Sequence, residues 1–195
     1  VYATDPAFVA AYNNKATLVK ASELKQMSGL KNPNMVLGVF IIPQPKTVDF
    51  KDWVLVLDDV RDPGNLGTII RLCDWFGIKH LVCSPNTVDC YNPKVLQATM
   101  GSVAKVNIVY TGLATFLKSV QVTIYGGFMN GVAVYGSSLP EKGVLIMGNE
   151  ANGISEEIEA LVAHKISIPQ FGDKTAESLN VATATAILLN EVRRK

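Results

Sequence analysis

Six short apolar runs, separated by segments of helical periodicity, set the strongest limit on the fold of this chain. The runs are rich in β-branched residues and span residues 53–57, 80–83, 106–109, 122–125, 144–147 and 165–168. Near-continuous apolar strands are buried on both faces, which is typical of a parallel sheet covered by helices. We therefore expect an α/β fold with helices on both faces of the sheet, and ligands beyond the carboxyl ends of the strands.

Two prolines divide the chain into unequal parts. Pro43 and Pro45 form a stiff, extended connector. Short helix and strand patterns before it predict part of a small α/β domain with its linker at residues 1–45, and the apolar runs predict the main domain at residues 46–195. The chain begins with Val1 rather than methionine, so we expect it to be a piece of a longer protein.

The composition excludes several classes of protein. The 18 Lys and Arg residues against 17 Asp and Glu give a net charge of +1, so an RNA partner would have to be bound by a local patch. The longest apolar stretch, residues 35–42, is far shorter than the roughly 20 residues of a membrane-spanning helix, and we expect no membrane association. Three cysteines favour buried thiols in a reducing compartment, and we expect a cytoplasmic location.

Other common chemistries find no support in the sequence. His80 and His164 have no Cys or His partner at metal-binding spacing, so we expect no metal site. The chain has no nucleophile elbow of a serine hydrolase, no Walker loop and no G-x-G-x-x-G after a strand. The predicted sheet therefore lacks the usual phosphate-binding loops.

A first polar cluster follows the run at residues 53–57. A tight turn leads to Asn65, a candidate N-cap for a helix at residues 68–76. Arg71 and Trp75 lie one turn apart on the side opposite the apolar face, where a surface helix usually carries several charges. They indicate a second buried surface, either a subunit interface or a ligand site, or else an exposed arginine stacked on the tryptophan.

Two more clusters come at the ends of later elements. Glu150 follows the run at residues 144–147 between small residues that leave room for a ligand, although a lone loop glutamate is more often a solvated charge. Ser178 and Asn180 precede the last helix, where they are either site residues or a plain N-cap region. That helix is apolar beyond one face, which together with Trp75 predicts a symmetric homodimer.

In this order, the three clusters resemble the motifs of the SpoU (TrmH) family of the SPOUT superfamily of RNA methyltransferases. The matching segments are Asp62-Pro63-Gly64-Asn65-Leu66-Gly67 with Arg71, then Gly148-Asn149-Glu150, then Ile168-Pro169 through Ser178-Leu179-Asn180-Val181. Three spaced motifs within residues 53–195 form a specific signal. Three positions depart from the family pattern, because Ala151 stands where glycine is usual, Ile154 where leucine is usual and Gly127 where threonine is common.

The resemblance implies a SPOUT fold with a C-terminal deep trefoil knot, S-adenosylmethionine as the cofactor and a homodimer. It implies methylation of a ribose 2′-hydroxyl in structured RNA, either ribosomal or transfer RNA, with residues 1–45 as part of a substrate-binding domain. The catalytic set that it implies is Asn65, Arg71, Glu150, Ser178 and Asn180. The cofactor pocket that it implies is lined by Gly127, Met147, Gly148, Ile168 and Leu179.

The family assigns the hydroxyl proton to the arginine that matches Arg71. A guanidinium keeps its proton at neutral pH and is a poor base, so we expect Arg71 to clamp a phosphate or the developing alkoxide. We expect Asn65 to orient this guanidinium and Glu150 to bind it in a bidentate pair. The alternative function is that of a non-catalytic RNA-binding or assembly protein on the same scaffold.

Overall fold

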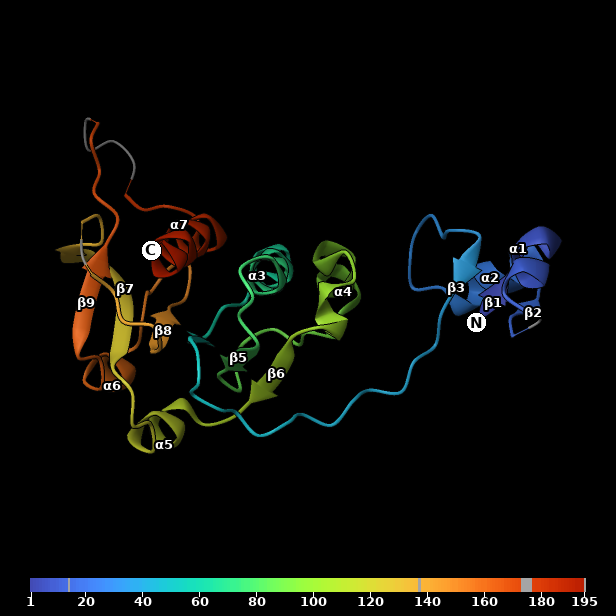
Figure 1. Ribbon diagram of the computed structural model, residues 1–195. Helices are drawn as coiled ribbons and strands as arrows, with labels where there is room; N and C mark the ends of the chain where they lie inside the picture. The colour runs from blue at the N-terminus through green and yellow to red at the C-terminus, as the bar shows by residue number, and fades with distance from the viewer. Residues whose placement is uncertain (14, 137, 173–176, 195) are drawn as a thin grey trace. The chain divides into compact units, whose positions relative to one another are not determined.

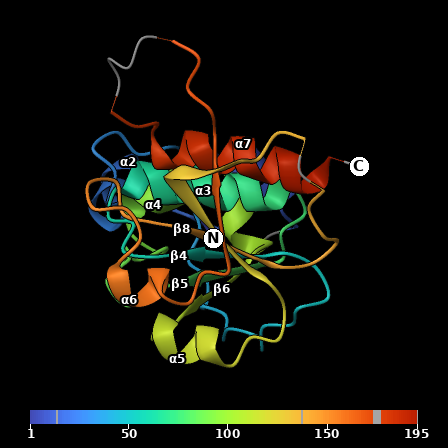
Figure 2. The same cartoon turned by 90° about the vertical axis from the view of Figure 1, so that its left-hand side faces the viewer.

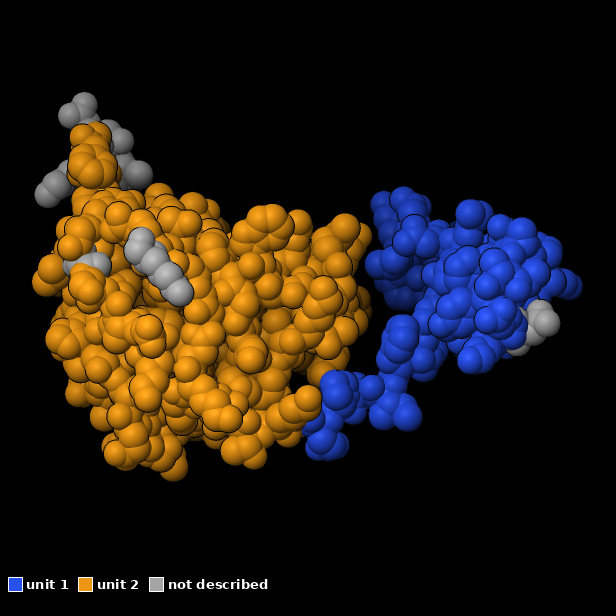
Figure 3. All heavy atoms as spheres, in the orientation of Figure 1, with its two compact units in different colours: residues 1–44 blue, residues 45–195 orange. Residues whose placement is uncertain are grey.

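In the computed structural model, the apolar runs form a parallel sheet covered by helices (Figure 1). The structure describes residues 1–13, 15–136, 138–172 and 177–194. The chain divides into two compact units, residues 1–44 and residues 45–195, which are coloured separately in Figure 3.

The larger unit contains a six-stranded sheet with the order β6-β5-β4-β8-β7-β9, and every neighbouring pair of strands is parallel. The strands are β4 (Val54–Leu57), β5 (His80–Cys83), β6 (Asn107–Tyr110), β7 (Ile124–Ala133), β8 (Val144–Met147) and β9 (His164–Ser167). The predicted α/β fold with a parallel sheet is confirmed.

Helices cover both faces of this sheet (Figures 1 and 2). One face carries α3 (Pro63–Trp75), α4 (Pro93–Thr99) and α7 (Val181–Arg193), with the 3₁₀ turn η1 (Ser102–Ala104) after α4, and the other carries α5 (Leu113–Lys118) and α6 (Glu156–Glu159). In β4, Leu55 and Leu57 join the core under α3 and α7, whereas Val54 and Val56 join the core under α5 and α6. Because successive side chains of a strand point to opposite faces, both faces of β4 must be apolar.

Helix α3 begins earlier than the sequence predicts. Its N-cap is Asp62, whose Oδ1 accepts a hydrogen bond from the backbone N–H of Asn65 (2.8 Å), and Pro63 occupies the first helical position. The prediction of Asn65 as N-cap is wrong, because an Asp-Pro pair satisfies the first turn three residues upstream. The side chain of Asn65 is therefore free to bond outside the helix.

Strand β7 is longer than its apolar run. It pairs with β8 only through Gly126 and continues beside β9 after an irregularity between Gly127 and Val132. A Cβ on Gly131 would lie 2.6 Å from the backbone of Ile166, so the close approach of these two strands requires glycine.

The smaller unit is a three-stranded sheet with two helices. Its elements are β1 (Tyr2–Ala3), α1 (Pro6–Ala11), β2 (Thr17–Leu18), α2 (Ala21–Met27) and β3 (Val36–Leu37). The strand order is β2-β1-β3, with β1 parallel to β2 and antiparallel to β3. No helix within the described ranges is long and apolar enough to cross a membrane.

The C-terminal end of α7 is tied to the segment just before β4 and to the end of α3. Arg193 donates two hydrogen bonds to the carboxylate of Asp52 (2.8 and 2.9 Å), one from Nε to the carbonyl of Phe76 (2.8 Å) and one to the carbonyl of Gly77 (3.2 Å). This clamp holds α7 alongside α3 (Figure 2). The N-termini of both helices then lie at the carboxyl edge of the sheet.

Candidate active site

Three segments that are distant in sequence meet at the carboxyl ends of β4 and β8. These are the loop from Asp58 into α3, the loop from Gly148 after β8, and the start of α7 at Asn180. The segments meet because β4 and β8 are neighbours in the sheet and α7 packs against α3. This is the edge where ligands bind in open parallel sheets.

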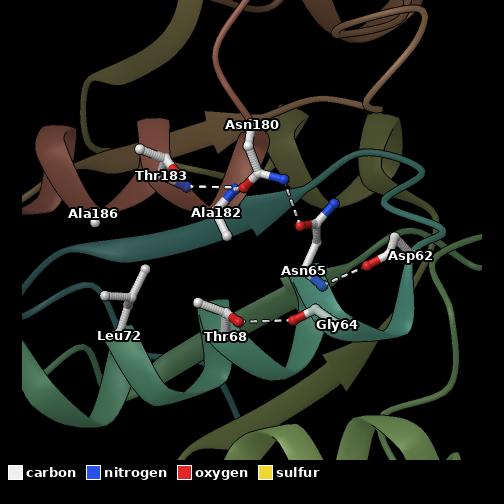
Figure 4. Close-up of a pocket in the computed structure, with 9 residues that line it drawn as sticks. All are labelled: Asp62, Gly64, Asn65, Thr68, Leu72, Asn180, Ala182, Thr183 and Ala186. Carbon is white, nitrogen blue, oxygen red and sulfur yellow. Dashed lines mark hydrogen bonds between the residues drawn. The ribbon is translucent and has the colours of Figure 1, made fainter.

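A chain of side-chain hydrogen bonds joins the three segments. Asn65 Nδ2 donates to Glu150 Oε1 (2.9 Å) across 85 residues, and Asn180 Nδ2 donates to Asn65 Oδ1 (2.8 Å) across 115 residues. Figure 4 shows the second of these bonds, with the amides of Asn65 and Asn180 facing each other from α3 and α7. One residue from each predicted motif thus takes part in a single network.

The N-terminus of α7 determines which side chain donates and which accepts in these hydrogen bonds. Asn180 is the N-cap of the helix, and its Oδ1 accepts from the backbone N–H groups of Ala182 (2.9 Å) and Thr183 (3.2 Å). Its Nδ2 must therefore point away from the helix, where it donates to Asn65. The oxygen of Asn65 is thus occupied, and its nitrogen is directed towards Glu150.

Glu150 is held as a carboxylate. Its Oε1 accepts from Asn65 Nδ2 and from the backbone N–H of Asp62 (3.3 Å), and its Oε2 accepts from the backbone N–H of Arg61 (3.3 Å). Burial raises the pKa of Glu150, but these hydrogen bonds outweigh it, so the pKa is lowered overall. A carboxylate with a lowered pKa and both oxygens occupied is a poor proton acceptor at neutral pH.

Further bonds fix the two loops to each other. Buried Asp58 accepts from the backbone N–H (2.8 Å) and the hydroxyl (2.7 Å) of Ser155, and Asn149 Nδ2 donates to the carbonyl of Asp59 (2.7 Å). A Cβ on Gly148 would lie 2.2 Å from the backbone of Gly153, so the loop can fold back only on glycine. The sequence analysis does not single out Asp58 or Ser155, although a carboxylate directly after a buried strand is an available signal for Asp58.

A groove of about 520 Å³ lies beside the network, between α3 and α7. Its lining combines polar groups near the helix N-termini with small or apolar groups further along, namely Asp62, Gly64, Asn65, Thr68, Leu72, Asn180, Ala182, Thr183 and Ala186 (Figure 4). The amides of Asn65 and Asn180 therefore border an open space that a ligand can enter.

Arg71 does not join this network. Its side chain is exposed and forms no hydrogen bond or ion pair with the residues that the structure describes, and Trp75 is 85% exposed without a cation–π contact among them. The expected pairing of Arg71 with Glu150 and its orientation by Asn65 are wrong within this chain. Six residues of α-helix place Arg71 about 9 Å along the axis from Asn65 and about 120° around it.

Ser178 precedes α7 and is exposed, without a hydrogen bond in the described part of the chain. The family resemblance implies a cofactor pocket, and the structure brings several of the residues named for it close together. A Cβ on Gly127 would lie 3.0 Å from Met147 Sδ, and Gly148 follows Met147 directly. Ile168 packs against the core cluster that contains Met147, whereas Leu179 is 51% exposed.

A metal site is not seen in the described ranges, where no three His, Cys, Asp or Glu side chains are grouped to hold an ion. The three cysteines are buried free thiols. Burial raises the pKa of Cys73 and of Cys83, so neither is a nucleophile at neutral pH.

Comparisons with known proteins agree on one family. The chain is 34% identical over 168 residues to the 23S rRNA (guanosine(2553)-2′-O)-methyltransferase RlmP of Bacillus subtilis, which covers 84% of this chain and 66% of that protein. The chain therefore spans slightly less than two thirds of this relative.

Two solved structures have the same fold. A TrmH-family protein from Porphyromonas gingivalis superimposes with a TM-score of 0.88 at 34% identity, covering 98% of this chain and 80% of that one. An AdoMet-bound rRNA methyltransferase from Sinorhizobium meliloti superimposes with a TM-score of 0.84 at 31% identity, covering 98% and 78%. Since the sequence model of the SpoU rRNA Methylase family also matches residues 52–190, this chain belongs to that family.

Proposed function

We propose that this chain, with residues 45–195 as its catalytic unit, acts as an S-adenosylmethionine-dependent methyltransferase that modifies a ribose 2′-hydroxyl in ribosomal RNA. The observation that carries the proposal is the Glu150–Asn65–Asn180 network, which joins one residue of each family motif at the carboxyl edge of the sheet. The similarity to RlmP favours ribosomal over transfer RNA as the substrate.

The residues at this edge fit S-adenosylmethionine. Because β7 pairs with β8 only through Gly126, the backbone of Gly127 is available to a ligand on the side of β8. Ile168 and Leu179 are partly exposed and, with Met147, offer apolar contacts to an adenine ring or a methionine chain. When bound, the cofactor supplies a methyl group that its sulfonium already activates.

The asparagines orient the ribose. After the bonds to Glu150 and Asn65, the amide nitrogens of Asn65 and Asn180 each keep one N–H, and both border the groove. These N–H groups hold the ribose oxygens in line for transfer, and the ionised Glu150 keeps Asn65 in place. Glu150 is not the base, since its pKa is lowered and its oxygens are occupied.

Arg71 stabilises the negative charge that develops on the 2′-oxygen as its proton leaves to solvent. The guanidinium has no partner in the described part of the chain, which leaves its planar set of donors free for RNA. Ser178, exposed at the start of the same edge, contributes a hydroxyl to the substrate side of the site.

The protein acts as a homodimer through the face formed by α3 and α7. Trp75, 85% exposed on α3, would be costly to leave in water, and Leu72 and Ala186 line the adjoining groove. Light scattering at micromolar concentration should give twice the chain mass, and a monomeric mass would contradict this assembly.

We also propose a role for the N-terminal unit, a knotted C-terminal segment and a cytoplasmic location. Residues 1–44 are part of a substrate-binding domain, since they form a separate α/β unit ahead of the catalytic one. The C-terminal segment is threaded as a deep trefoil knot; the return of the chain from the edge strand β9 to α7 beside α3 supports this topology. The cytoplasmic location stays a prediction, which the buried free thiols favour.

The activity is tested by methyl transfer and by cofactor binding. Calorimetry should show S-adenosylmethionine binding, and mapping of 2′-O-methyl sites in RNA from a deletion strain should reveal the lost nucleotide. A non-catalytic RNA-binding protein on this scaffold would bind RNA without binding the cofactor, and that result would overturn the proposal.

Arg71→Ala tests the mechanism itself. Cofactor binding should stay nearly intact, while the single-turnover rate falls by about a hundredfold, the scale of losing one preorganised electrostatic contact. Arg71→Lys should recover little of that rate, because a point charge does not reproduce a planar fork. A rate within a few-fold of wild type in the folded Arg71→Ala protein would remove Arg71 from the active site.

A further inference from the structure

A second arginine lies at the carboxyl edge of the sheet, next to the candidate site. The side chain of Arg61 is 68% exposed, and its Nε donates to Asp59 Oδ1 (2.9 Å). Its two terminal nitrogens have no hydrogen-bond partner among the residues that the structure describes. The backbone N–H of the same residue donates to Glu150, so Arg61 is tied to the network while part of its guanidinium stays free.

Asp59, which holds this guanidinium, is itself fixed in three directions. Its backbone N–H donates to Ser84 Oγ (2.9 Å), its carbonyl accepts from Asn149 Nδ2 (2.7 Å) and its carboxylate accepts from Arg61. Its φ of 61° lies in the left-handed region, which is unfavourable for a residue other than glycine and is kept only where surrounding contacts fix the backbone. Ordinary surface ion pairs have mobile partners, whereas here the anchor of the arginine is rigid.

The charge around this edge is otherwise negative. Asp58, Asp59, Asp62 and Glu150 all lie in the loops that meet there. In the described ranges, the ion pairs and hydrogen bonds of these four carboxylates include one cationic side chain, Arg61. At physiological salt, charges act over about 8 Å, so an RNA phosphate near Asn65 is repelled unless a cation offsets these carboxylates.

We propose that Arg61 is a positioning residue that binds a phosphate of the RNA backbone beside the target ribose through its two terminal nitrogens. The proposal rests on the proposed function and adds a substrate contact to it. Asp59 orients the guanidinium through the bond to Nε, and the N–H groups of the two terminal nitrogens can then donate to two oxygens of one phosphate. Arg61 therefore acts on RNA placement, whereas Arg71 acts on the charge of the reacting oxygen.

The test measures RNA binding and methyl transfer with unmethylated 23S rRNA transcribed in vitro as the probe. Arg61→Met should weaken binding about three- to tenfold at physiological salt and reduce the slope of log affinity against log salt by about 0.7–0.9, the contribution of one phosphate contact. KM for the RNA should rise with kcat nearly unchanged. Arg61→Lys should keep the salt slope while recovering only part of the affinity.

Arg194→Met is the matched control. Arg194 is a similar exposed arginine (54%) in an ion pair with Glu191 (2.7 Å), at the opposite end of α7 from Asn180. Its loss should leave the salt slope unchanged. The same slope and affinity for Arg61→Met as for wild type would overturn the inference.

Failure of the inference and failure of the proposed function are distinguishable. Wild-type protein that binds the transcript without methylating it would contradict the proposed function, whereas the salt slopes would still decide the role of Arg61. Methylation by wild type with no change of slope in Arg61→Met would contradict only the inference. A wild-type chain without salt-dependent RNA binding would overturn both.

Discussion

Asn180→Asp separates the two roles of Asn180, which are the cap of α7 and the donor to Asn65. An aspartate is nearly the same size and caps a helix as well as asparagine does, so the bonds from Ala182 and Thr183 should persist. The substitution replaces the Nδ2 donor by a carboxylate oxygen. That oxygen would face Asn65 Oδ1 across the 2.8 Å that the hydrogen bond spans, and two acceptor oxygens repel each other. Asn65 must then turn away or give up its bond to Glu150.

Asn180→Asp should change the stability little and the methylation rate strongly. The lost hydrogen bond costs about 0.5–1.5 kcal/mol of stability, and a carboxylate at a helix N-terminus returns about 0.3–1 kcal/mol, so the free energy of unfolding should change by about 1 kcal/mol or less. The methylation rate should fall by about tenfold to a hundredfold, because Asn65 no longer holds a fixed N–H towards the ribose.

The assay is single-turnover transfer of a radiolabelled methyl group to the 23S transcript, with urea unfolding of the same samples. Asn92→Asp is the matched control, since Asn92 caps α4 by accepting from the backbone N–H of Lys94 (2.9 Å) and lies outside the network. A folded Asn180→Asp protein that methylates within threefold of wild type would refute the role of the Asn65 amide in catalysis.

Three other predictions concern the parts that hold the site together. Gly148→Ala should distort the loop after β8 and lower the free energy of unfolding by about 3 kcal/mol in urea titrations, whereas Gly112→Ala, where a Cβ meets open space, should cost far less. Arg193→Met should lower it by about 2 kcal/mol, a modest figure because Arg193 and Asp52 are each about one third exposed. Because the pKa of Glu150 is lowered in the folded protein, its carboxylate stabilises the fold at pH values above the ordinary pKa of 4.5. This stabilisation is lost as the pH falls through the lowered pKa. The stability difference between wild type and Glu150→Gln should therefore hold near neutral pH and shrink below about pH 4.5; a difference that grows at low pH would contradict this sign.

Local sequence determined the positions of the strands. The observed β5 and β8 coincide with predicted runs, and β4, β6 and β9 begin within one residue of theirs. A strand buried on both faces must be apolar at nearly every residue, so a few consecutive residues are enough to predict it. The resemblance to the SpoU (TrmH) motifs likewise implies that Asn65, Glu150 and Asn180 belong to one set, and in the structure hydrogen bonds join them at one edge of the sheet.

Tertiary structure decided how these residues connect. The sequence predicts a pair between Glu150 and Arg71, but the loop after β8 meets the first turn of α3, so Glu150 bonds to Asn65 and Arg71 stays exposed outside the network. The earlier start of α3, at Pro63, is by contrast a local effect, because Asp62 caps the helix through the backbone N–H of Asn65. Hydrogen-bond partners depend on distances between elements far apart in the chain, and such distances arise only when the sheet and its helices pack together.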